Sequence, residues 1–513
     1  MKKFSQIATL VCLSLFSNSG WAGFDNGKEI EGWYPRSLDS ELFVRKSPMG
    51  TIRTLRLSIS GWGTTFEVEE RRTLDSQPIF KKSFLVSGYY QPRGMTEKDG
   101  ALFLISNRVY SDISPSVIKI DLATGNYIER SNFSAIFTAA GAGSCPHPKL
   151  LNLRPTDSGL FVNLNCVVSA TVALDNSLAP VSGKALFYPS AFADSSDQKI
   201  LSLVHCESEE KRCYEAYDLK LGQAKSFQLD TPVYDKFYSA DATDWFFFHY
   251  YWSENKIQVH KINKSTLEKT TFSFKLFKGG TIGDFEEPIV LPNQDFVLLH
   301  NNSNKDGLVT NIYHFGPNGV EKARTSVQGR VTIIYQNGLR SLGEQAVHGD
   351  KLYLKTLEEW VYVNPDNERM KVDSFNLYAI SLSGDLKVLG HQHFFPKSSL
   401  PEGQIFPGNV YSLDTDVWTN LGTLSNDGKV IVGIEKIQKT VVSQQSKLEV
   451  TESNTYVFDD QLVLQQKMDT GIMPYFFDGT WMVGSDFGGI GPFKHDPWGQ
   501  IRGSTYKFFQ YQP

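Results

Sequence analysis

The stretch Asp99-Gly-Ala-Leu-Phe-Leu-Ile-Ser106, continued by Ser116-Val-Ile-Lys-Ile-Asp-Leu-Ala-Thr-Gly-Asn-Tyr-Ile-Glu129, decides the fold. A polar turn that carries an aspartate leads into an alternating apolar run, and a second run, a turn at Ala123-Thr124-Gly125 and a third run follow. Alternation with a period of two is typical of β-strands, and the short turn favours antiparallel neighbours. The stretch therefore predicts three antiparallel strands, which make up most of one blade of a β-propeller.

The same unit recurs along the chain. Eight polar turns of this kind lead into apolar runs, at Asp99, Asp157, Asp197, Asp244, Asp295, Asp350, Asp427 and Asp478. The gaps between these aspartates are 58, 40, 47, 51, 55, 77 and 51 residues. A repeat of this length built from strands is typical of a radially repeated all-β fold. We therefore predict an all-β propeller of eight blades, with seven blades as the alternative.

The two ends of the chain complement each other in this plan. The last unit ends at Tyr511 without an outer strand, whereas the strand-like pieces Leu55–Ile59 and Thr65–Glu69 precede the first complete unit. An open ring would leave unpaired backbone groups at its edges. We therefore predict that an N-terminal strand completes the last blade. A further feature is the polar excursion from about Glu435 to Ser453, which predicts a long hairpin extending beyond its blade.

Two short segments of the first unit resemble known propellers. Pro92-Arg-Gly-Met95, just before Asp99, resembles the opening of blades in NHL and strictosidine-synthase-like propellers. Ile120-Asp-Leu-Ala-Thr-Gly125 is similar to the third-strand turn of quinoprotein-type and YVTN-type propellers. This resemblance covers about 40 residues, a single repeat unit. It implies the architecture and carries no active site.

The first residues predict export. Lys2 and Lys3 precede an apolar stretch from Ile7 to Phe16, and Gly20-Trp-Ala22 provides small residues at an A-x-A-like cleavage site. A membrane anchor is the alternative, but the apolar stretch is about half of the roughly 20 residues that span a bilayer. We expect residues 1–22 to be a cleaved signal peptide and residues 23–513 to form a single propeller domain. The expected location is the periplasm or the exterior of a bacterial cell.

The charge balance bears on the partners. Removing residues 1–22 leaves 49 basic and 56 acidic residues, so the formal charge of the mature chain is −7. Without a basic excess we expect no nucleic-acid partner and no insertion into a membrane after cleavage of the signal. We expect a protein or glycan ligand, bound by the loops of one face.

Four cysteines remain in the mature chain. Cys206 and Cys213 flank a charged turn between two strand-like runs, a spacing that suits a disulfide across a hairpin. Cys145 and Cys166 are the remaining pair, joined by elimination. Buried free thiols are the alternative, although an oxidising compartment favours disulfides.

Candidate site residues lie near the expected mouth of the central channel. Asp284, Glu286 and Glu287 precede the inner strand of the fifth unit, and His249 and His300 lie at the ends of the fourth and fifth inner strands. Carboxylates and histidines that meet at a channel mouth can bind a cation or act as acid and base. A solvated loop and packed histidines are the competing interpretations. His391 and His393, which flank Gln392, form a similar but later pair.

Two further loops are candidates for ligand binding. Trp498 lies in the glycine-rich and aromatic-rich segment Gly484–Gly499 with Phe487 and His495, and its ring offers a platform for a sugar or a peptide. Packing of this loop on itself is the alternative. The segment Asn302–Gly307 matches the first six positions of a calcium loop, but Tyr313 stands at the twelfth, where a glutamate is needed. A polar hairpin turn is the competing interpretation.

These patterns predict an architecture more firmly than a chemistry. The sequence has no G-x-S-x-G or H-E-x-x-H motif, so the enzyme classes that carry those motifs are disfavoured. We expect a binding or interaction protein with no cofactor. The alternative is a propeller enzyme, a glycan-active hydrolase or lyase or a quinone-dependent dehydrogenase, with its site at the channel mouth.

Overall fold

In the computed structural model of this chain, the described residues run from 23 to 512 with gaps. The longer gaps are 30–40, 109–115, 136–148, 205–210, 230–236, 276–288, 341–346, 396–403, 408–414 and 487–505, and shorter gaps lie between them. The described residues are almost entirely in β-strands, with a helical turn at residues 133–135.

Six sheets have four strands each, and in each sheet the strands follow one another in chain order. The first three contain β3 (Glu41–Lys46), β4 (Ile52–Ser60), β5 (Gly63–Arg71) and β6 (Phe80–Ser87); β7 (Tyr90–Lys98), β8 (Ala101–Arg108), β9 (Ser116–Asp121) and β10 (Tyr127–Arg130); and β11 (Lys149–Thr156), β12 (Gly159–Asn165), β13 (Ser169–Asp175) and β14 (Leu186–Phe187). The next three contain β15 (Phe192–Asp194), β16 (Lys199–Val204), β17 (Arg212–Asp218) and β18 (Gln223–Leu229); β19 (Phe237–Ala240), β20 (Asp244–Tyr251), β21 (Lys256–Asn263) and β22 (Lys269–Lys275); and β23 (Ile289–Val290), β24 (Phe296–Asn304), β25 (Gly307–Phe315) and β26 (Glu321–Gln328).

The rest of the described chain forms two larger sheets and a small hairpin. The ten-stranded sheet contains β27 (Arg330–Val331), β30 (Val347–His348), β31 (Lys351–Val363), β32 (Arg369–Ser381), β33 (Val388–Phe394), β34 (Gln404–Pro407), β35 (Thr415–Asn426), β36 (Lys429–Val442), β37 (Gln445–Asp459) and β38 (Leu464–Met468). The five-stranded sheet contains β39 (Ile472–Phe477), β40 (Trp481–Asp486), β41 (Tyr506–Gln512), β1 (Gly23–Phe24) and β2 (Lys28–Glu29), and the hairpin is β28 (Tyr335–Gln336) with β29 (Leu339–Arg340).

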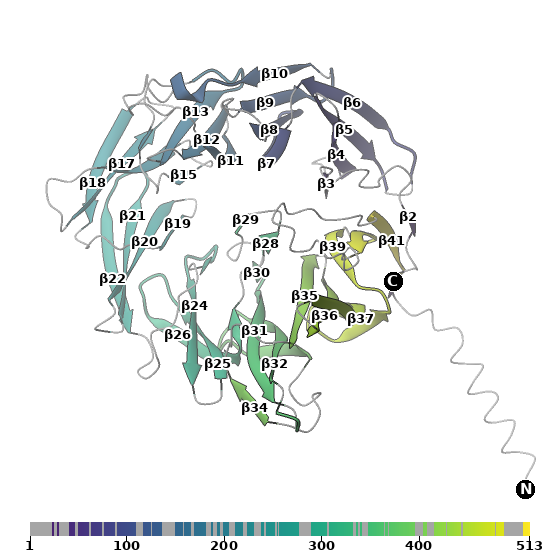
Figure 1. Ribbon diagram of the computed structural model, residues 1–513. Coiled ribbons are helices and arrows are strands. Elements are labelled where there is room, and N and C mark those ends of the chain that lie inside the picture. Colours follow the sequence, from purple (N-terminus) through teal and green to yellow (C-terminus); the bar gives the residue numbers. More distant parts are fainter. Residues whose placement is uncertain are drawn as a thin grey trace, which may run out of the picture.

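The sheets succeed one another around a common centre, with the first strand of each four-stranded sheet nearest to it (Figure 1). The predicted all-β, propeller-like architecture is therefore confirmed. The sequence interpretation placed each innermost strand directly after the aspartate turn, and this was wrong. The innermost strand precedes the turn, as β19 and β23 do, and these strands of four and two residues are too short to leave a pattern of alternation.

Both faces of a sheet are buried, which explains the unbroken aromatic run of β20. Trp245 and Phe247 pack on one side with Leu201 and Tyr214 of the preceding sheet. Phe246 and Phe248 pack on the other side with residues of the following sheet, including Phe296, Leu298 and Tyr313. Successive side chains of a strand point to opposite faces, so a strand that lies between two neighbours is apolar at every position.

The repeated aspartates have a structural role in the fifth and sixth sheets. Asp295 is buried and accepts hydrogen bonds from His314 Nε2 at 2.8 Å and from Lys322 Nζ at 2.6 Å. Burial acts to raise its pKa, but the bonds from Lys322 and His314 and the charge of Lys322 outweigh burial, so the pKa of Asp295 lies below its usual value. Asp244 is held in the same way by Thr243, Gln294 and Lys261. Each aspartate thus ties its turn to later strands or to the neighbouring sheet.

A second recurrent turn lies between the third and fourth strands. Asp175 Oδ1 accepts backbone N–H bonds from Ser177 at 2.8 Å and Ala179 at 2.9 Å. Within this turn Leu178 has a φ of 62°, a conformation that is costly for a residue with a Cβ. Its side chain is almost fully buried, which offsets that cost by about 1.5–3 kcal/mol. Leu267, Leu386 and Leu462 repeat this left-handed leucine.

The two ends of the chain meet in the five-stranded sheet. Gly23 pairs with Gln512 and Phe24 with Tyr511, so β1 adds an antiparallel strand to the outer side of β41. Next to it, β2 pairs with the earlier part of β41. The predicted N-terminal strand is therefore present in the last sheet, although its residues lie well before the strand-like pieces that suggested it, which form β4 and β5 of the first sheet.

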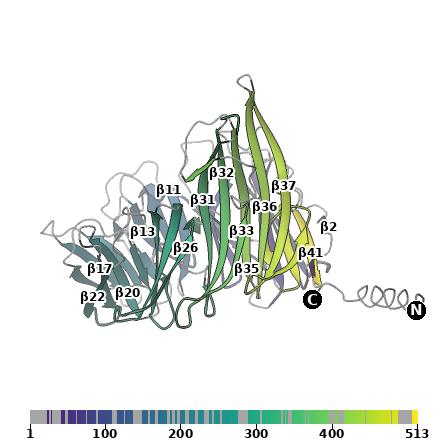
Figure 2. The ribbon, with the colours of Figure 1, turned by 90° about the horizontal axis from the view of Figure 1, so that it is seen from below.

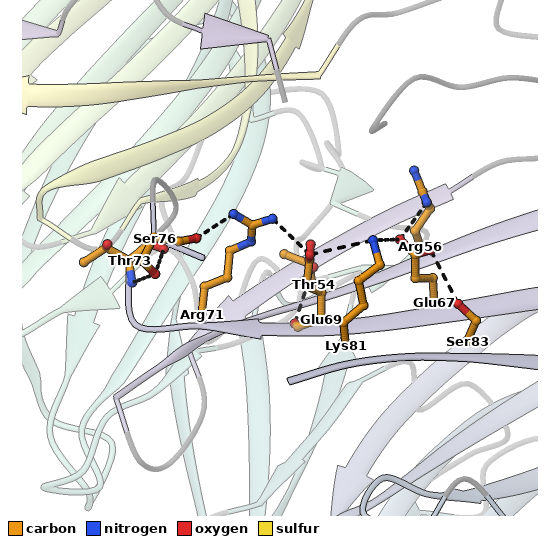
Figure 3. Close-up of polar contacts among 9 residues, drawn as sticks. All are labelled: Thr54, Arg56, Glu67, Glu69, Arg71, Thr73, Ser76, Lys81 and Ser83. Carbon is orange, nitrogen blue, oxygen red and sulfur yellow. Dashed lines mark hydrogen bonds and ion pairs between the residues drawn. The ribbon is translucent and has the colours of Figure 1, made fainter. Parts of the chain in front are cut away.

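The first sheet turns a charged face away from the second sheet. Phe66 and Val68 of β5 pack against the second sheet, so Glu67 and Glu69 lie on the opposite face, toward the five-stranded sheet. Figure 3 shows Glu67 bonded to Arg56 at 2.6 Å and Glu69 bonded to Arg71 at 2.9 Å. Lys81 lies 3.3 Å from Glu67. In the part of the chain that the structure describes, this face of the first sheet is lined by ion pairs between its own residues, whereas the fifth and sixth sheets meet through apolar side chains.

The ten-stranded sheet rises beyond the rest of the molecule (Figure 2). β31 and β32 have 13 residues each, β36 has 14 and β37 has 15, whereas no strand of the four-stranded sheets exceeds nine. At about 3.3 Å per residue, β37 spans about 50 Å. Met370–Val372 of β32 pair in parallel with Thr415–Val417 of β35, which joins two antiparallel meanders into one sheet. The predicted long hairpin between Glu435 and Ser453 is confirmed as the upper part of β36 and β37.

Candidate functional site

Most of the residues that the sequence singled out lie outside the described residues. Among the predicted ligand-binding residues these are Asp284, Glu286, Glu287 and Trp498, so their convergence stays a prediction. Cys145, Cys166 and Cys206 also lie outside them. Cys213 is disulfide-bonded, while its expected pairing with Cys206 stays a prediction.

His249 and His300 are both described and both buried, at 4% and 6% exposure. His249 shares a face of β20 with Trp245 and Phe247, toward the fourth sheet, and its ring lies edge-on to Tyr251 at 4.5 Å. His300 shares a face of β24 with Phe296 and Leu298, toward the fifth sheet, and burial lowers its pKa. The two rings therefore enter different layers between sheets, and the structure does not bring them into one site.

The segment that resembled a calcium loop is a strand hairpin. Asn302, Ser303 and Asn304 belong to β24 and pair with Val309, Leu308 and Gly307 of β25. Only two residues separate the paired ends, and Gly307 has a φ of 122° that suits such a turn. The segment is therefore a polar hairpin, which was the competing interpretation.

A cluster of polar side chains lies on the ten-stranded sheet, where it extends past the sixth sheet. Leu352 and Leu354 of β31 and Tyr378 and Ile380 of β32 pack on the sixth sheet in one apolar cluster. Further along the same face the residues become polar. They are Thr356 and Glu358 on β31, Ser374 and Asn376 on β32, and His391 and His393 on β33, and we call Glu358, Ser374, Asn376, Tyr378, His391 and His393 the histidine ledge.

The end of the sixth sheet fixes the lower border of the ledge. Thr356 Oγ1 donates to the carbonyl oxygen of Gln328 at 2.6 Å, and the Tyr378 hydroxyl accepts the Gln328 N–H at 3.2 Å. Gln328 is the last residue of β26, so this sheet ends at the level of Tyr378. Above this level, His391 and His393 of the ledge are exposed, whereas Glu358 and Asn376 are buried.

A chain of hydrogen bonds leads from His391 through Asn376 to Glu358. The Nε2 of His391 lies 2.8 Å from Asn376 Oδ1, and Asn376 Nδ2 donates to Glu358 Oε1 at 2.6 Å. Since Asn376 donates with its nitrogen, its oxygen accepts from His391, which places the proton of neutral His391 on Nε2. His393 Nε2 lies 2.6 Å from Ser374 Oγ and 3.6 Å from Glu358 Oε1.

The rings of the ledge are stacked. Tyr378 and His391 have centroids 4.4 Å apart and planes 7° from parallel, and His391 and His393 have centroids 6.0 Å apart with planes 26° from parallel. Burial, and then the charge of His393, lower the pKa of His391 more than Glu358 raises it. Burial also raises the pKa of Tyr378 to about 12. At neutral pH the stack therefore presents an uncharged imidazole beside a neutral phenol.

This geometry suits binding better than nucleophilic catalysis. A serine, a histidine and a glutamate meet here, but Ser374 Oγ and Glu358 Oε1 both face the same nitrogen of His393. In a catalytic triad the acid holds the other ring nitrogen. Ser374 is also fully buried, and its hydroxyl donates to the Phe394 carbonyl oxygen at 3.2 Å. The ledge can offer imidazole ring surface and, from neutral His391, an Nδ1 acceptor to a ligand.

Sequence reasoning noticed His391 and His393 but not their partners. Glu358 follows the mixed segment Lys355-Thr-Leu357 and precedes Glu359, and Ser374 and Asn376 alternate with Phe375 and Leu377 as in any half-exposed strand. The available signal was a row of alternate polar residues on each of two successive strands. Pairing those strands in register would have placed Asn376 opposite His393.

The described residues contain no cluster of three or more histidine, cysteine or acidic side chains that could hold a metal ion. Within the same residues, no helix has the length and apolar character needed to cross a membrane.

Comparison with known proteins gives distant structural similarities only. No protein family and no curated protein sequence matches the chain. Among solved structures, BamB from Moraxella catarrhalis is similar with a TM-score of 0.34 and 9% identity, covering 92% of this chain and 98% of that one. A prolyl endopeptidase has a TM-score of 0.34 and 9% identity over 66% of this chain and 47% of its own. Dipeptidyl peptidase 4 of Porphyromonas gingivalis has a TM-score of 0.32 and 10% identity, and the match covers 86% of this chain and 57% of that one. TM-scores this low carry no argument about function.

Proposed function

We propose that this chain is an exported β-propeller that binds a glycan at the histidine ledge. The observation that carries the proposal is the stack of Tyr378, His391 and His393, which rises from a buried phenol to two exposed imidazoles. Flat ring faces pack well against the apolar faces of sugar rings and lose little entropy in doing so. A protein ligand on the same projecting sheet is the alternative partner.

We count nine blades in the proposed ring, one more than the eight predicted from the aspartate repeats. Six are the four-stranded sheets, two come from the ten-stranded sheet, and the ninth is the five-stranded sheet. The parallel pairing of β32 with β35 supports this division, because every other pairing in that sheet is antiparallel. The ring closes when β1 and β2 join β41.

Export to the periplasm or the cell exterior is part of the proposal. Cleavage after Ala22 would leave Gly23 as the first residue, and Gly23 is the first residue of β1. Cleavage at this point removes the predicted signal peptide and keeps every paired residue of the closing strand. The disulfide at Cys213 fits an oxidising compartment.

Hydrogen bonds within the ledge hold its imidazoles in fixed orientations. The buried Glu358 and Asn376 fix the imidazoles from behind, so the rings are already oriented before a ligand arrives. Pre-orientation reduces the entropy that binding costs. The enzyme alternative would use acids at the channel mouth, and Asp284, Glu286 and Glu287 lie outside the described residues.

A glycan array with the mature protein tests this function. We expect a defined set of oligosaccharides to be bound, and binding to fall at least tenfold in the double variant His391→Ala, His393→Ala. The control is Tyr127→Ala, which removes an exposed aromatic ring from β10 and should leave binding unchanged. An array without bound glycans, or one on which the double variant binds as well as the wild type, overturns the glycan proposal.

A further inference from the structure

Lys355 occupies an apolar position between two packed parts of the ten-stranded sheet. On β31 the side chains of Tyr353, Lys355 and Leu357 point to the face opposite Leu352 and Leu354. Tyr353 and Leu357 pack on this face against an apolar cluster. Its members come from β32, β33, β36 and β37 and include Phe375, Leu377, Phe394, Val432, Ile434 and Phe458. A lysine therefore stands where its strand neighbours on that face are a tyrosine and a leucine.

The ammonium group of Lys355 has no hydrogen bond or ion pair with any described residue. Its Nζ lies 5.8 Å from the centre of the Phe375 ring. By contrast, Lys351 on the same face is paired with Asp460, and the Tyr353 hydroxyl donates to the Asp460 carbonyl oxygen at 3.0 Å. A largely buried ammonium without an anion is unfavourable, and the simplest relief is loss of its proton.

Burial lowers the pKa of Lys355 to about 8. An exposed lysine has a pKa of about 10.4, so at pH 7 the neutral fraction of Lys355 exceeds that of an exposed lysine about 200-fold. Other titratable groups on the packed strands include Glu359, Asp373, Lys436, Glu452 and Tyr456. Tyr353 keeps its proton in this range, because burial and the nearby aspartates raise its pKa to about 12.

We propose that Lys355 is a covalent capture site for a small aldehyde or ketone, which it holds as an imine between the packed strands. A desolvated lysine in apolar surroundings is the usual form of an amine that attacks carbonyl compounds. The Nζ lone pair forms a C–N bond to the carbonyl carbon, and the carbonyl oxygen takes up a proton while the nitrogen loses one. Loss of water then gives the C=N bond, so one water leaves and nothing is oxidised or reduced.

The product fits its surroundings better than the free amine does. An imine in an apolar layer stays neutral, so capture replaces a group that is charged part of the time with one that carries no charge. The half-buried position of Lys355 admits a small neutral molecule. This capture is separate from glycan binding at the ledge, which lies on the other face of β31.

Reductive labelling of the mature protein tests the proposal. The protein is incubated with acetaldehyde at pH 7, and sodium borohydride added to samples at successive times converts each imine into an ethylamine. Peptide mass spectrometry then gives the initial rate at each lysine. We expect Lys355 to react at least tenfold faster than the exposed Lys225, with the ratio falling toward one at pH 10. Equal or slower labelling of Lys355 at pH 7 overturns the proposal.

Two variants sharpen this result. Lys355→Met keeps a long apolar side chain and should abolish the fast phase of labelling, whereas Lys225→Met should remove only a slow component. A fast phase that survives in Lys355→Met would assign it to another amine and overturn the proposal. The site-resolved rates in the wild type decide the matter even if the Lys355→Met substitution destabilises the fold.

Discussion

The aspartates in the turns of this protein differ in the burial and the bonding of their carboxylates. Asp99 and Asp295 both lie between the first and second strands of their sheets. The Asp99 side chain is 73% exposed and lies 3.6 Å from Lys98, while the Asp295 side chain is 2% exposed and bonded to Lys322 and His314. Exposed ion pairs contribute little to stability, whereas breaking a buried pair leaves a charge without its partner. An aspartate between the first and second strands therefore contributes little to stability in the second sheet and more in the sixth sheet.

We predict that Asp295→Asn lowers the free energy of unfolding at pH 7 by about 1–3 kcal/mol. The pKa of Asp295 is lowered in the folded state, so its stabilisation is present above the unfolded pKa of about 3.9 and is lost as the pH falls through the folded value. The variant and the wild type should thus approach each other in stability as the pH falls below 4. Urea unfolding at pH 7 and pH 3 measures both effects.

The control for this prediction is Asp99→Asn, which keeps the left-handed turn conformation because asparagine tolerates it. Its unfolding free energy should change by less than about 0.5 kcal/mol. A stability loss of equal size in both variants would contradict the distinction between the two turns.

At the scale of the element, the sequence predicted strands and turns well but not their order within a sheet. The apolar runs in β8, β20 and β24 gave the second strand of each sheet, since those strands are long and buried on both faces. Some innermost strands, such as β19 and β23, are short, and their pairing depends on the ring, which no local pattern encodes. The partners of His391 and His393 in the histidine ledge were missed because the residues of the ledge come from three strands and meet only through strand register.

The long hairpin of β36 and β37 can be shortened without loss of the fold. Its core residues, Val430, Ile431, Val432, Ile434, Val457 and Phe458, all lie in the lower part. We predict that replacing residues 439–448 by Asn-Gly, between the paired Gln438 and Glu449, changes the unfolding free energy by less than about 1 kcal/mol. Thermal unfolding and circular dichroism check this. A drop of more than about 10 °C in Tm, or lost strand signal, would show that the upper hairpin supports the sheet.

At the scale of the whole molecule, the ring is held unevenly. Fully buried aromatic side chains such as Phe246, Phe296 and Tyr313 join the fifth and sixth sheets. At the seam between the first and last sheets, the face that the first sheet turns toward the last sheet instead carries Arg56, Glu67, Glu69 and Lys81, whose ion pairs lie within the first sheet. Partly exposed pairs of this kind stabilise their own sheet by about 0–1 kcal/mol each. The architecture was predictable from the repeats. The nature of this seam was not, because β5 reads as an ordinary strand with one apolar and one charged face.

We predict that the ring opens first at this seam. In native-state hydrogen exchange, the amides of β41 that bond to β1 and β2 should exchange at lower free energy than those between β24 and β25. Uniform protection of all sheets would show that the seam is as strong as the other contacts. A chain lacking residues 23–29 should lose protection in β41 selectively.

Because Gly23 pairs with Gln512, β1 cannot take its place in the sheet until β41 has been synthesised. Until then the growing polypeptide is an arc with two unpaired sheet edges, and each edge can pair with a strand of a neighbouring chain. A chain whose synthesis stops early would keep those unpaired edges permanently. A chaperone that covers β1 until synthesis is complete would therefore raise the yield of this protein.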